Sequence, residues 1–133
     1  MNSKLRIGAL ISGGGTNLQA VIDACENQSV SGQVVFVGTD NPGAKGLERA
    51  RRHNIPSFVV DYGAILRAYR QDPAAQPLPD DFDFADIEDK CALFPPETTA
   101  DRIRHFLETR AIAEAALIEA MAPYPYDLLI LAG

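Results

Sequence analysis

Tryptophan is absent from this 133-residue chain, and cysteine occurs only twice. Cys25 and Cys91 lie far apart without a C-x-x-C spacing, so the sequence supports neither a metal site nor a redox motif. Cys25 falls on the apolar face of an expected helix and is interpreted as a core residue. No apolar run is long enough for a membrane span or a signal peptide. We therefore expect a cytoplasmic protein with no membrane contact.

Basic residues are also scarce. Twelve Lys and Arg stand against eighteen Asp and Glu, which gives a formal net charge of −6 at pH 7. This balance argues against a nucleic-acid partner, although a local positive site for a phosphate remains compatible with it. With 47% hydrophobic and 23% charged residues, the composition is that of an ordinary globular protein, and the length predicts one domain over residues 1–133.

Glycine, in contrast, is concentrated near the N-terminus. An apolar run over Leu5–Ile11 ends at Ser12, and three consecutive glycines follow at residues 13–15. Thr16 comes next and is the expected N-cap of a helix. The apolar positions after it keep the spacing of one helix face, namely Leu18, Val21, Ile22 and Cys25. The stretch predicts a buried strand, a glycine loop and the start of a helix.

Such a junction favours an anion, because the first backbone N–H groups of a helix lack partners and glycines let a ligand approach them. The candidate phosphate-binding residues are Gly14, Gly15, Thr16 and Asn17. Leu18 replaces the third glycine of a dinucleotide fingerprint, and the Gly-Lys-Ser/Thr of a P-loop is missing. A single phosphate is therefore favoured, and a tight turn without any ligand stays the alternative.

Strands and helices alternate along the rest of the chain, which predicts an α/β fold. We expect a Rossmann-like open parallel sheet of about four strands in the order 3-2-1-4, with flanking helices. The later strands are expected at Gln33–Thr39, Ile55–Val60 and Asp127–Gly133. Helices are expected at Gly46–His53, with its basic residues outward, and from Thr98 or Thr99 to Pro123, with a further helical turn at Ala64–Tyr69.

Residues 70–98 differ from everything around them. They contain five prolines and eight acids against two basic residues, which predicts a loop-like or mobile acidic insertion. A calcium loop is excluded by its spacing, because Asp86 would occupy the glycine position. The segment is interpreted as a solvated flap, with a lid or a docking loop as the alternative.

Three blocks together resemble the phosphoribosylglycinamide formyltransferases, also called glycinamide ribonucleotide transformylases, in their N-terminal half. They are ISGGGTNLQAVIDAC (Ile11–Cys25), GLERAR (Gly46–Arg51) and DLLILAG (Asp127–Gly133). The resemblance implies transfer of a formyl group from 10-formyltetrahydrofolate to the amine of glycinamide ribonucleotide, in purine biosynthesis. It implies that the glycine loop holds the ribonucleotide phosphate and that Arg110 lies on the folate side.

The catalytic asparagine, histidine and aspartate of that family follow its L-A-G strand, so no catalytic residue is predicted here. His53 and His105 lack the motif context and are expected at the surface. We expect the chain alone to be inactive, and a non-catalytic phosphoribosyl-ligand binding or regulatory module is the alternative. Leu128–Ala132 should form an uncovered apolar edge strand through which the chain self-associates.

Overall fold

A computed structural model describes residues 3–133, and these divide into two compact units. The first unit comprises the chain up to Tyr62 together with Glu119–Gly133, and the second unit comprises Gly63–Ile118. The second unit is thus wider than the insertion expected at residues 70–98.

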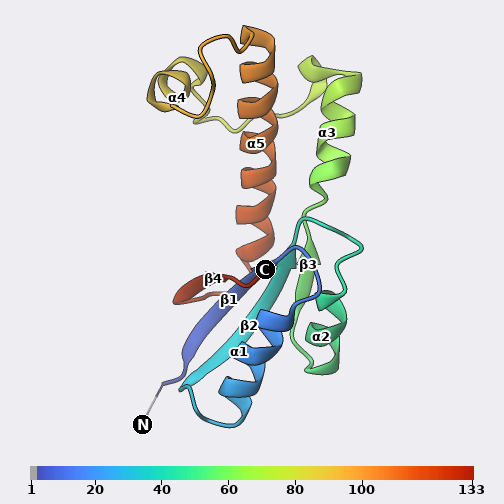
Figure 1. Cartoon of the computed structure of the whole chain (residues 1–133), viewed down its shortest axis with the longest axis vertical. Helices are drawn as coiled ribbons and strands as arrows, with labels where there is room; N and C mark the ends of the chain where they lie inside the picture. Colours follow the sequence, from blue (N-terminus) through green and yellow to red (C-terminus); the bar gives the residue numbers. More distant parts are fainter. Residues whose placement is uncertain (1–2) are drawn as a thin grey trace. The chain divides into compact units, whose positions relative to one another are not determined.

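The first unit is built on a parallel four-stranded sheet (Figure 1). Its strands are β1 (Leu5–Ile11), β2 (Gly32–Thr39), β3 (Ser57–Val59) and β4 (Leu128–Leu131). Their order is β3-β2-β1-β4, and each neighbouring pair is parallel. The predicted fold class and strand order are confirmed.

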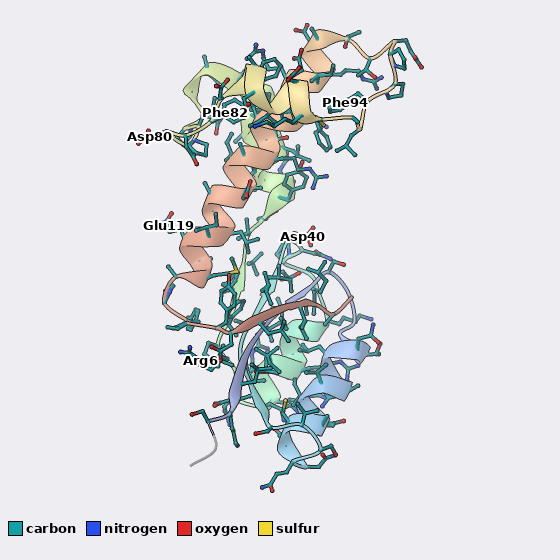
Figure 2. All side chains as sticks on the ribbon, turned by 90° about the vertical axis from the view of Figure 1, so that its left-hand side faces the viewer. Arg6, Asp40, Asp80, Phe82, Phe94 and Glu119 are labelled. Carbon is teal, nitrogen blue, oxygen red and sulfur yellow. The ribbon has the colours of Figure 1, made fainter. Side chains whose placement is uncertain are left out.

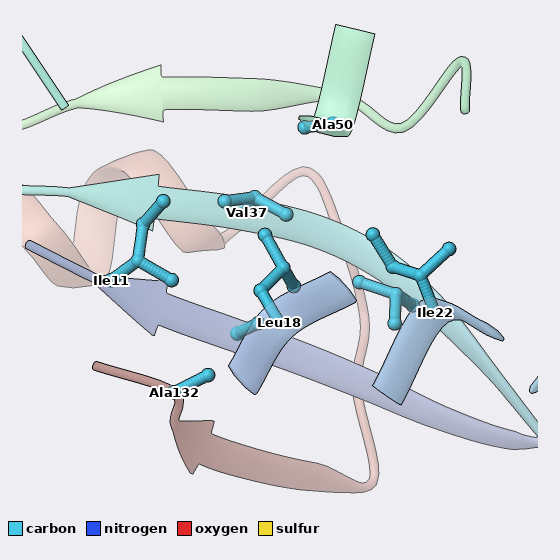
Figure 3. Packing of buried hydrophobic residues seen from close by; sticks show 8 residues of the cluster. Ile11, Leu18, Ile22, Val37, Ala50 and Ala132 are labelled. Atoms are coloured by element: carbon cyan, nitrogen blue, oxygen red, sulfur yellow. The ribbon is translucent and has the colours of Figure 1, made fainter. Parts of the chain in front are cut away.

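Helices α1 (Thr16–Glu26) and α2 (Gly46–Arg52) bury their apolar sides against one face of this sheet. Val34 and Val37 of β2 are three positions apart, a spacing that would place them on opposite faces of a regular strand. A β-bulge in the pairing of β1 with β2, next to Ile7, shifts the register between them, so both side chains join the same core. Figure 3 shows this core packing around Leu18 of α1. The buried cluster consists of Ala9, Ile11, Leu18, Ile22, Val34, Val37, Ala50 and Ala132.

Aromatic side chains cover the other face of the sheet. Phe36 of β2 is fully buried, and three rings lie 5.4 to 6.0 Å from it, centroid to centroid. These rings belong to Phe58, Tyr124 and Tyr126. A Cβ added at Gly8 would lie 2.3 Å from the Phe36 ring, so only glycine leaves room for it at that point of β1. Both faces of the sheet are therefore packed, as its apolar strands require.

Two expected boundaries in the first unit were wrong. Gly15, and not Thr16, is the N-cap residue of α1, and Thr16 is already helical. The third strand begins at Ser57 and not at Ile55, because the Ile55 N–H donates to the carbonyl of Ala50 and thereby belongs to the turn that ends α2. Pro56 then has no N–H to offer the sheet.

The second unit is helical, with α3 (Tyr62–Gln71), a 3-10 turn at Pro73–Ala75, α4 (Phe84–Lys90) and most of α5 (Ala100–Met121). The expectation of a loop-like segment at 70–98 is thus wrong for part of its length. Asp83 caps α4, its Oδ1 accepting from the N–H of Asp86 at 3.2 Å, and the short acidic helix follows from that cap.

Helix α3 is also longer than the single turn expected at Ala64–Tyr69, while the start of α5 agrees with prediction. The Thr99 hydroxyl accepts from the N–H of Arg102 at 3.3 Å, and Asp101 lies in the first turn. Tyr69 of α3 and Glu108 of α5 are both buried, and the tyrosine hydroxyl donates to the carboxylate at 2.6 Å. Helices α3 and α5 are thus joined by a buried polar contact.

Candidate phosphate-binding loop

The glycine loop follows β1 at the carboxyl end of the sheet, beside the end of β4. The Ser12 N–H and hydroxyl both donate to the carbonyl of Gly133, the hydroxyl at 3.1 Å. Asn41, after β2, donates from its side-chain amide to the Ser12 carbonyl at 3.3 Å. In the order β3-β2-β1-β4 the connections reverse direction between β1 and β4, which is where open α/β sheets bind their ligands.

Gly15 fixes the shape of the loop. Its φ of 73° lies in the left-handed region, which favours glycine. A Cβ there would also lie 2.8 Å from the Cα of Gly46, the first residue of α2. The N–H of Gly46 donates to the Gly13 carbonyl at 3.0 Å. The loop therefore rests directly on the start of α2, and its conformation is set by backbone contacts.

The loop presents unused donors. In residues 3–133, the backbone N–H groups of residues 13–18 donate to no acceptor, as expected at a helix start that no side chain caps. The side chains of Thr16 and Asn17 are exposed and have no hydrogen-bond partner in the same range. The space around Gly13 and Gly14 is open, since a Cβ at either would meet nothing within 4 Å. The arrangement can surround a small anion with N–H and side-chain donors.

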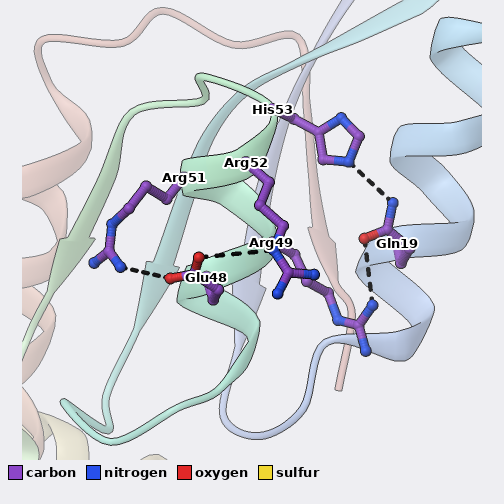
Figure 4. A network of polar contacts seen from close by, with 6 residues as sticks. All are labelled: Gln19, Glu48, Arg49, Arg51, Arg52 and His53. Atoms are coloured by element: carbon purple, nitrogen blue, oxygen red, sulfur yellow. Dashed lines mark hydrogen bonds and ion pairs between the residues drawn. The ribbon is translucent and has the colours of Figure 1, made fainter.

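Arg49 is a residue of this site that the sequence reasoning missed. It was expected to point outward, but it is half-buried, and its Nε donates to the Gly14 carbonyl at 2.8 Å while Nη1 donates to the Gln19 Oε1 at 3.3 Å. Figure 4 shows the contact between Arg49 and Gln19 beside the outward Arg51 and Arg52, which pair with Glu48. The available signal was spacing: Arg49 lies three residues after Gly46, on the helix side that meets the loop. It adds a positive charge next to the donors.

The two histidines, which were expected at the surface, are partly exposed and partly buried. His53 Nδ1 lies 2.6 Å from Glu26 Oε1, and Nε2 lies 3.2 Å from Gln19 Nε2, so the ring links α2 to α1. His105, in the second unit, packs edge-on against Tyr69 at 5.0 Å between ring centroids. Both rings therefore make structural contacts, and none of these partners belongs to the glycine loop.

Arg110 is exposed on α5 in the second unit, whereas the glycine loop belongs to the first. Its guanidinium lies over the Phe106 ring, 4.9 Å from the centroid. Cys25 is buried as predicted, and this burial raises the pKa of its thiol, which keeps it protonated and unreactive. No group of three His, Cys, Asp or Glu side chains within residues 3–133 is arranged to hold a metal ion.

The family model for formyl transferases matches residues 5–133, nearly the whole chain. The chain belongs to the formyl transferase family. Within residues 3–133, none of the helices of this formyl transferase is both long and apolar enough to cross a membrane.

Curated relatives of this formyl transferase agree with that assignment. The chain is 51% identical over 59 residues to the trifunctional purine biosynthetic protein adenosine-3 of Chironomus tentans. The aligned stretch covers 43% of this chain and 4% of that protein. The chain is 49% identical over 56 residues to the phosphoribosylglycinamide formyltransferase of Escherichia coli K12, covering 42% of this chain and 26% of that enzyme. The chain thus matches only a minor part of the length of these relatives.

Solved structures extend the likeness to the whole chain. Glycinamide ribonucleotide transformylase 1 from Symbiobacterium toebii matches with a TM-score of 0.61 and 31% identity, covering 100% of this chain and 43% of that structure. The phosphoribosylglycinamide formyltransferase of Bacillus halodurans, at 22% identity and a TM-score of 0.58, shows the shared fold. The predicted resemblance to the N-terminal part of glycinamide ribonucleotide transformylases is confirmed.

Proposed function

We propose that this chain binds the phosphate of glycinamide ribonucleotide through Gly14, Gly15, Thr16 and Asn17, as the substrate-phosphate part of a folate-dependent formyl transferase. The observation that carries the proposal is the set of unused backbone N–H groups at residues 13–18. The loop that contains them is held in place by the packing of Gly15 against Gly46 of α2 and by the hydrogen bond from Arg49 to the Gly14 carbonyl. Purine-pathway names among the relatives supply the substrate class. We further infer that the protein acts in the cytoplasm.

The test is calorimetric titration with glycinamide ribonucleotide, comparing the chain with the double variant Thr16→Val/Asn17→Leu. These side chains have no partners within residues 3–133, so the variant removes donors without breaking a described contact. Hydrogen bonds to charged groups contribute about 1.5–3 kcal/mol each, so binding should weaken at least tenfold. A Cβ at Gly14 meets nothing within 4 Å, so the side chain of Gly14→Leu should fit without disturbing the fold. That side chain would then occupy the space proposed for the phosphate and block binding sterically.

Gly43→Ala is the matched control. Gly43 lies in an exposed turn after β2, where a Cβ would make an ordinary contact of 3.4 Å with Asn41. It should bind as tightly as the parent chain, and all variants should melt at similar temperatures. Equal affinity of the Thr16→Val/Asn17→Leu variant and the parent would refute the loop as the phosphate site.

We propose that the 133 residues bind substrate without transferring a formyl group. Transfer needs a group that moves the amine proton and a donor for the developing oxyanion. His53 is engaged with Glu26 and Gln19, and His105 packs on Tyr69. Assays with 10-formyltetrahydrofolate should give no formylated product, and measurable turnover would overturn this part. Binding without turnover is also what the binding or regulatory module would give.

By resemblance, Arg110 is proposed to contact the co-substrate 10-formyltetrahydrofolate. Its guanidinium is positioned over Phe106 on an exposed part of α5. Arg110→Gln should weaken folate binding while leaving the affinity for glycinamide ribonucleotide unchanged. Folate affinity that does not respond to this substitution would remove Arg110 from the proposal.

The edge strand β4 is proposed to pair with the same strand of a second copy. β4 bonds to β1 on one side only, and Leu128, Leu129 and Leu131 are 45%, 36% and 84% exposed. An edge of this kind offers unpaired backbone groups and apolar side chains to an identical edge. Sedimentation should show dimers that Leu131→Lys dissociates. A monomer at every working concentration would contradict the pairing.

A further inference from the structure

A pocket of about 610 Å³ is lined only by residues of the second unit, and none of the residues proposed to bind phosphate is among them. Its wall combines Arg70 from the end of α3 with Arg102 and His105 from the start of α5. Phe94, from the segment between α4 and α5, and Phe106 complete its apolar side (Phe94 is labelled in Figure 2).

The charge of this pocket opposes that of its surroundings. Residues 63–118 contain six basic residues against eleven acidic ones. Nevertheless the guanidinium groups of Arg70 and Arg102 make no hydrogen bond or ion pair within residues 3–133, and Asp101 is the one acidic side chain on the wall. Two unpaired guanidinium groups against one carboxylate give the pocket wall a net positive charge that attracts an anion, and their planar forks suit phosphate in particular.

The apolar side of the pocket suits a flat ring. Phe94 and Phe106 are half-buried and meet edge to face, with ring centroids 5.2 Å apart. The His105 ring beside them is held at 90° to the ring of Tyr69, whose hydroxyl is fixed by Glu108. The aromatic wall is therefore positioned by packing and does not have to be ordered by a ligand.

The pocket of about 460 Å³ in the first unit lacks such a preference. Lys4 and Glu26 both line it, and its histidine, His53, is already bound to Glu26. One lysine and one glutamate give this wall no net formal charge, whereas two arginines against one aspartate leave the wall of the second-unit pocket positive.

We propose that the second-unit pocket binds a nucleoside monophosphate, with the phosphate on Arg70 and Arg102 and the base on the Phe94–Phe106 wall. The Thr98 hydroxyl, also on the wall, supplies a further donor. This binding is separate from the glycine loop proposed for the ribonucleotide phosphate and does not depend on it, although Arg110, the proposed folate contact, lies over Phe106 of the pocket wall.

The experiment is an NMR titration of the full chain with AMP, followed through its two histidine rings. His105 lines the pocket and should shift and saturate, whereas His53, in the first unit, should stay in place. Adenosine, ribose 5-phosphate and inorganic phosphate are the comparison probes. AMP should bind at least tenfold more tightly than each of them, because only AMP offers both the ring and the phosphate.

Arg70→Gln and Arg102→Gln should each weaken AMP binding about tenfold, as expected for the loss of one charge-assisted contact. Arg67→Gln is the matched control, since Arg67 is exposed on the same helix as Arg70 but does not line the pocket. It should bind AMP as the parent does. Circular dichroism should show all three variants folded, because no described side-chain contact is lost.

The Thr16→Val/Asn17→Leu variant separates this site from the glycine loop. It should keep the full AMP response of His105 even though it loses glycinamide ribonucleotide. Three results would each overturn the proposal: no His105 shift with AMP, equal weakening by Arg67→Gln, or a His105 response that disappears in the glycine-loop variant. Inorganic phosphate binding as tightly as AMP would overturn the assignment of the ring to the phenylalanine wall.

Discussion

Different kinds of interaction stabilise the interior of each of the two units of this molecule. The first unit pairs four strands that are distant in sequence and buries most of the core, including Phe36 and Leu18 at 0% exposure. The second unit is made of helices, and its buried hydrophobic residues are only Tyr69 and Leu107 among those described in 3–133. Local stability follows buried apolar area, so the second unit should open at a lower free energy than the first.

Matched leucine truncations should show the largest difference between the units. Leu18→Ala removes a fully buried side chain from the core between α1 and the sheet, and should lower the free energy of global unfolding by about 2–5 kcal/mol. Leu107→Ala, at a position 8% exposed, should mainly increase amide exchange within residues 63–118. Denaturant unfolding and hydrogen exchange measure the two effects. Equal loss of global stability would show that the units unfold together.

Overpacking the aromatic face of the sheet should cost somewhat less. A Cβ at Gly8 would lie 2.3 Å from Cζ of Phe36, a ring that three other aromatics enclose. Gly8→Ala should therefore destabilise the first unit by about 1–3 kcal/mol. Gly13→Ala, where a Cβ has open space, is the control and should leave thermal unfolding unchanged. A Gly8→Ala variant as stable as that control would mean that the ring moves away without cost.

The same contrast explains how far the sequence could predict the fold. Strand, glycine loop and helix over residues 5–26 were predictable because their pattern is local and the apolar spacing changes from strand to helix at the glycines. The bulge beside Ile7 and the short β3 were not, because both depend on which residues pair across the sheet. In the second unit, α4 was missed because its seven residues, three of them acidic, are too few to show a clear helical periodicity, and its Asp83 cap was not recognised.

The candidate site shows the same limit. The glycines, Thr16 and Asn17 were placed correctly at the start of α1, although their contact with a phosphate stays a prediction. Arg49 was missed, because its three-residue spacing from Gly46 points to the loop only once α2 is known to pack against that loop. Arg70 and Arg102 are distant in sequence and line one pocket only after α3 and α5 are assembled.

Alkaline pH should test the polar contact that holds the second unit. Burial and the hydrogen bond to Glu108 raise the pKa of Tyr69 to about 12, so the neutral phenol is favoured in the folded state. This contribution to stability is complete below pH 10 and is lost as the pH rises from about 10 to 12. Phenolate absorbance should show one of four tyrosines titrating late. Tyr69→Phe should remove that late step, and Glu108→Gln should lower its pKa; a late step that persists in Tyr69→Phe would assign it to another tyrosine.

The smallest effect is expected at the exposed end of β4 in the first unit. Arg6 donates to the Asp127 carboxylate from its backbone N–H at 2.9 Å, from Nε at 3.2 Å and from Nη2 at 2.9 Å. These bonds lower the pKa of Asp127 to about 2, and the Asp127 N–H returns a bond to the Arg6 carbonyl at 2.8 Å. The pair fixes the start of β4 against β1.

A lowered pKa makes this contribution present above about pH 4 and lost as the pH falls toward 2. Asp127→Asn should therefore be less stable than the parent at neutral pH and equal to it below pH 2, as measured by denaturant unfolding across that range. Asp86→Asn, which breaks an exposed ion pair with Lys90 in the second unit, should change stability less, because that pair joins neighbouring turns of a single helix and connects no strands. A larger effect of Asp86→Asn would reverse the assignment of the stabilising long-range contacts to the first unit.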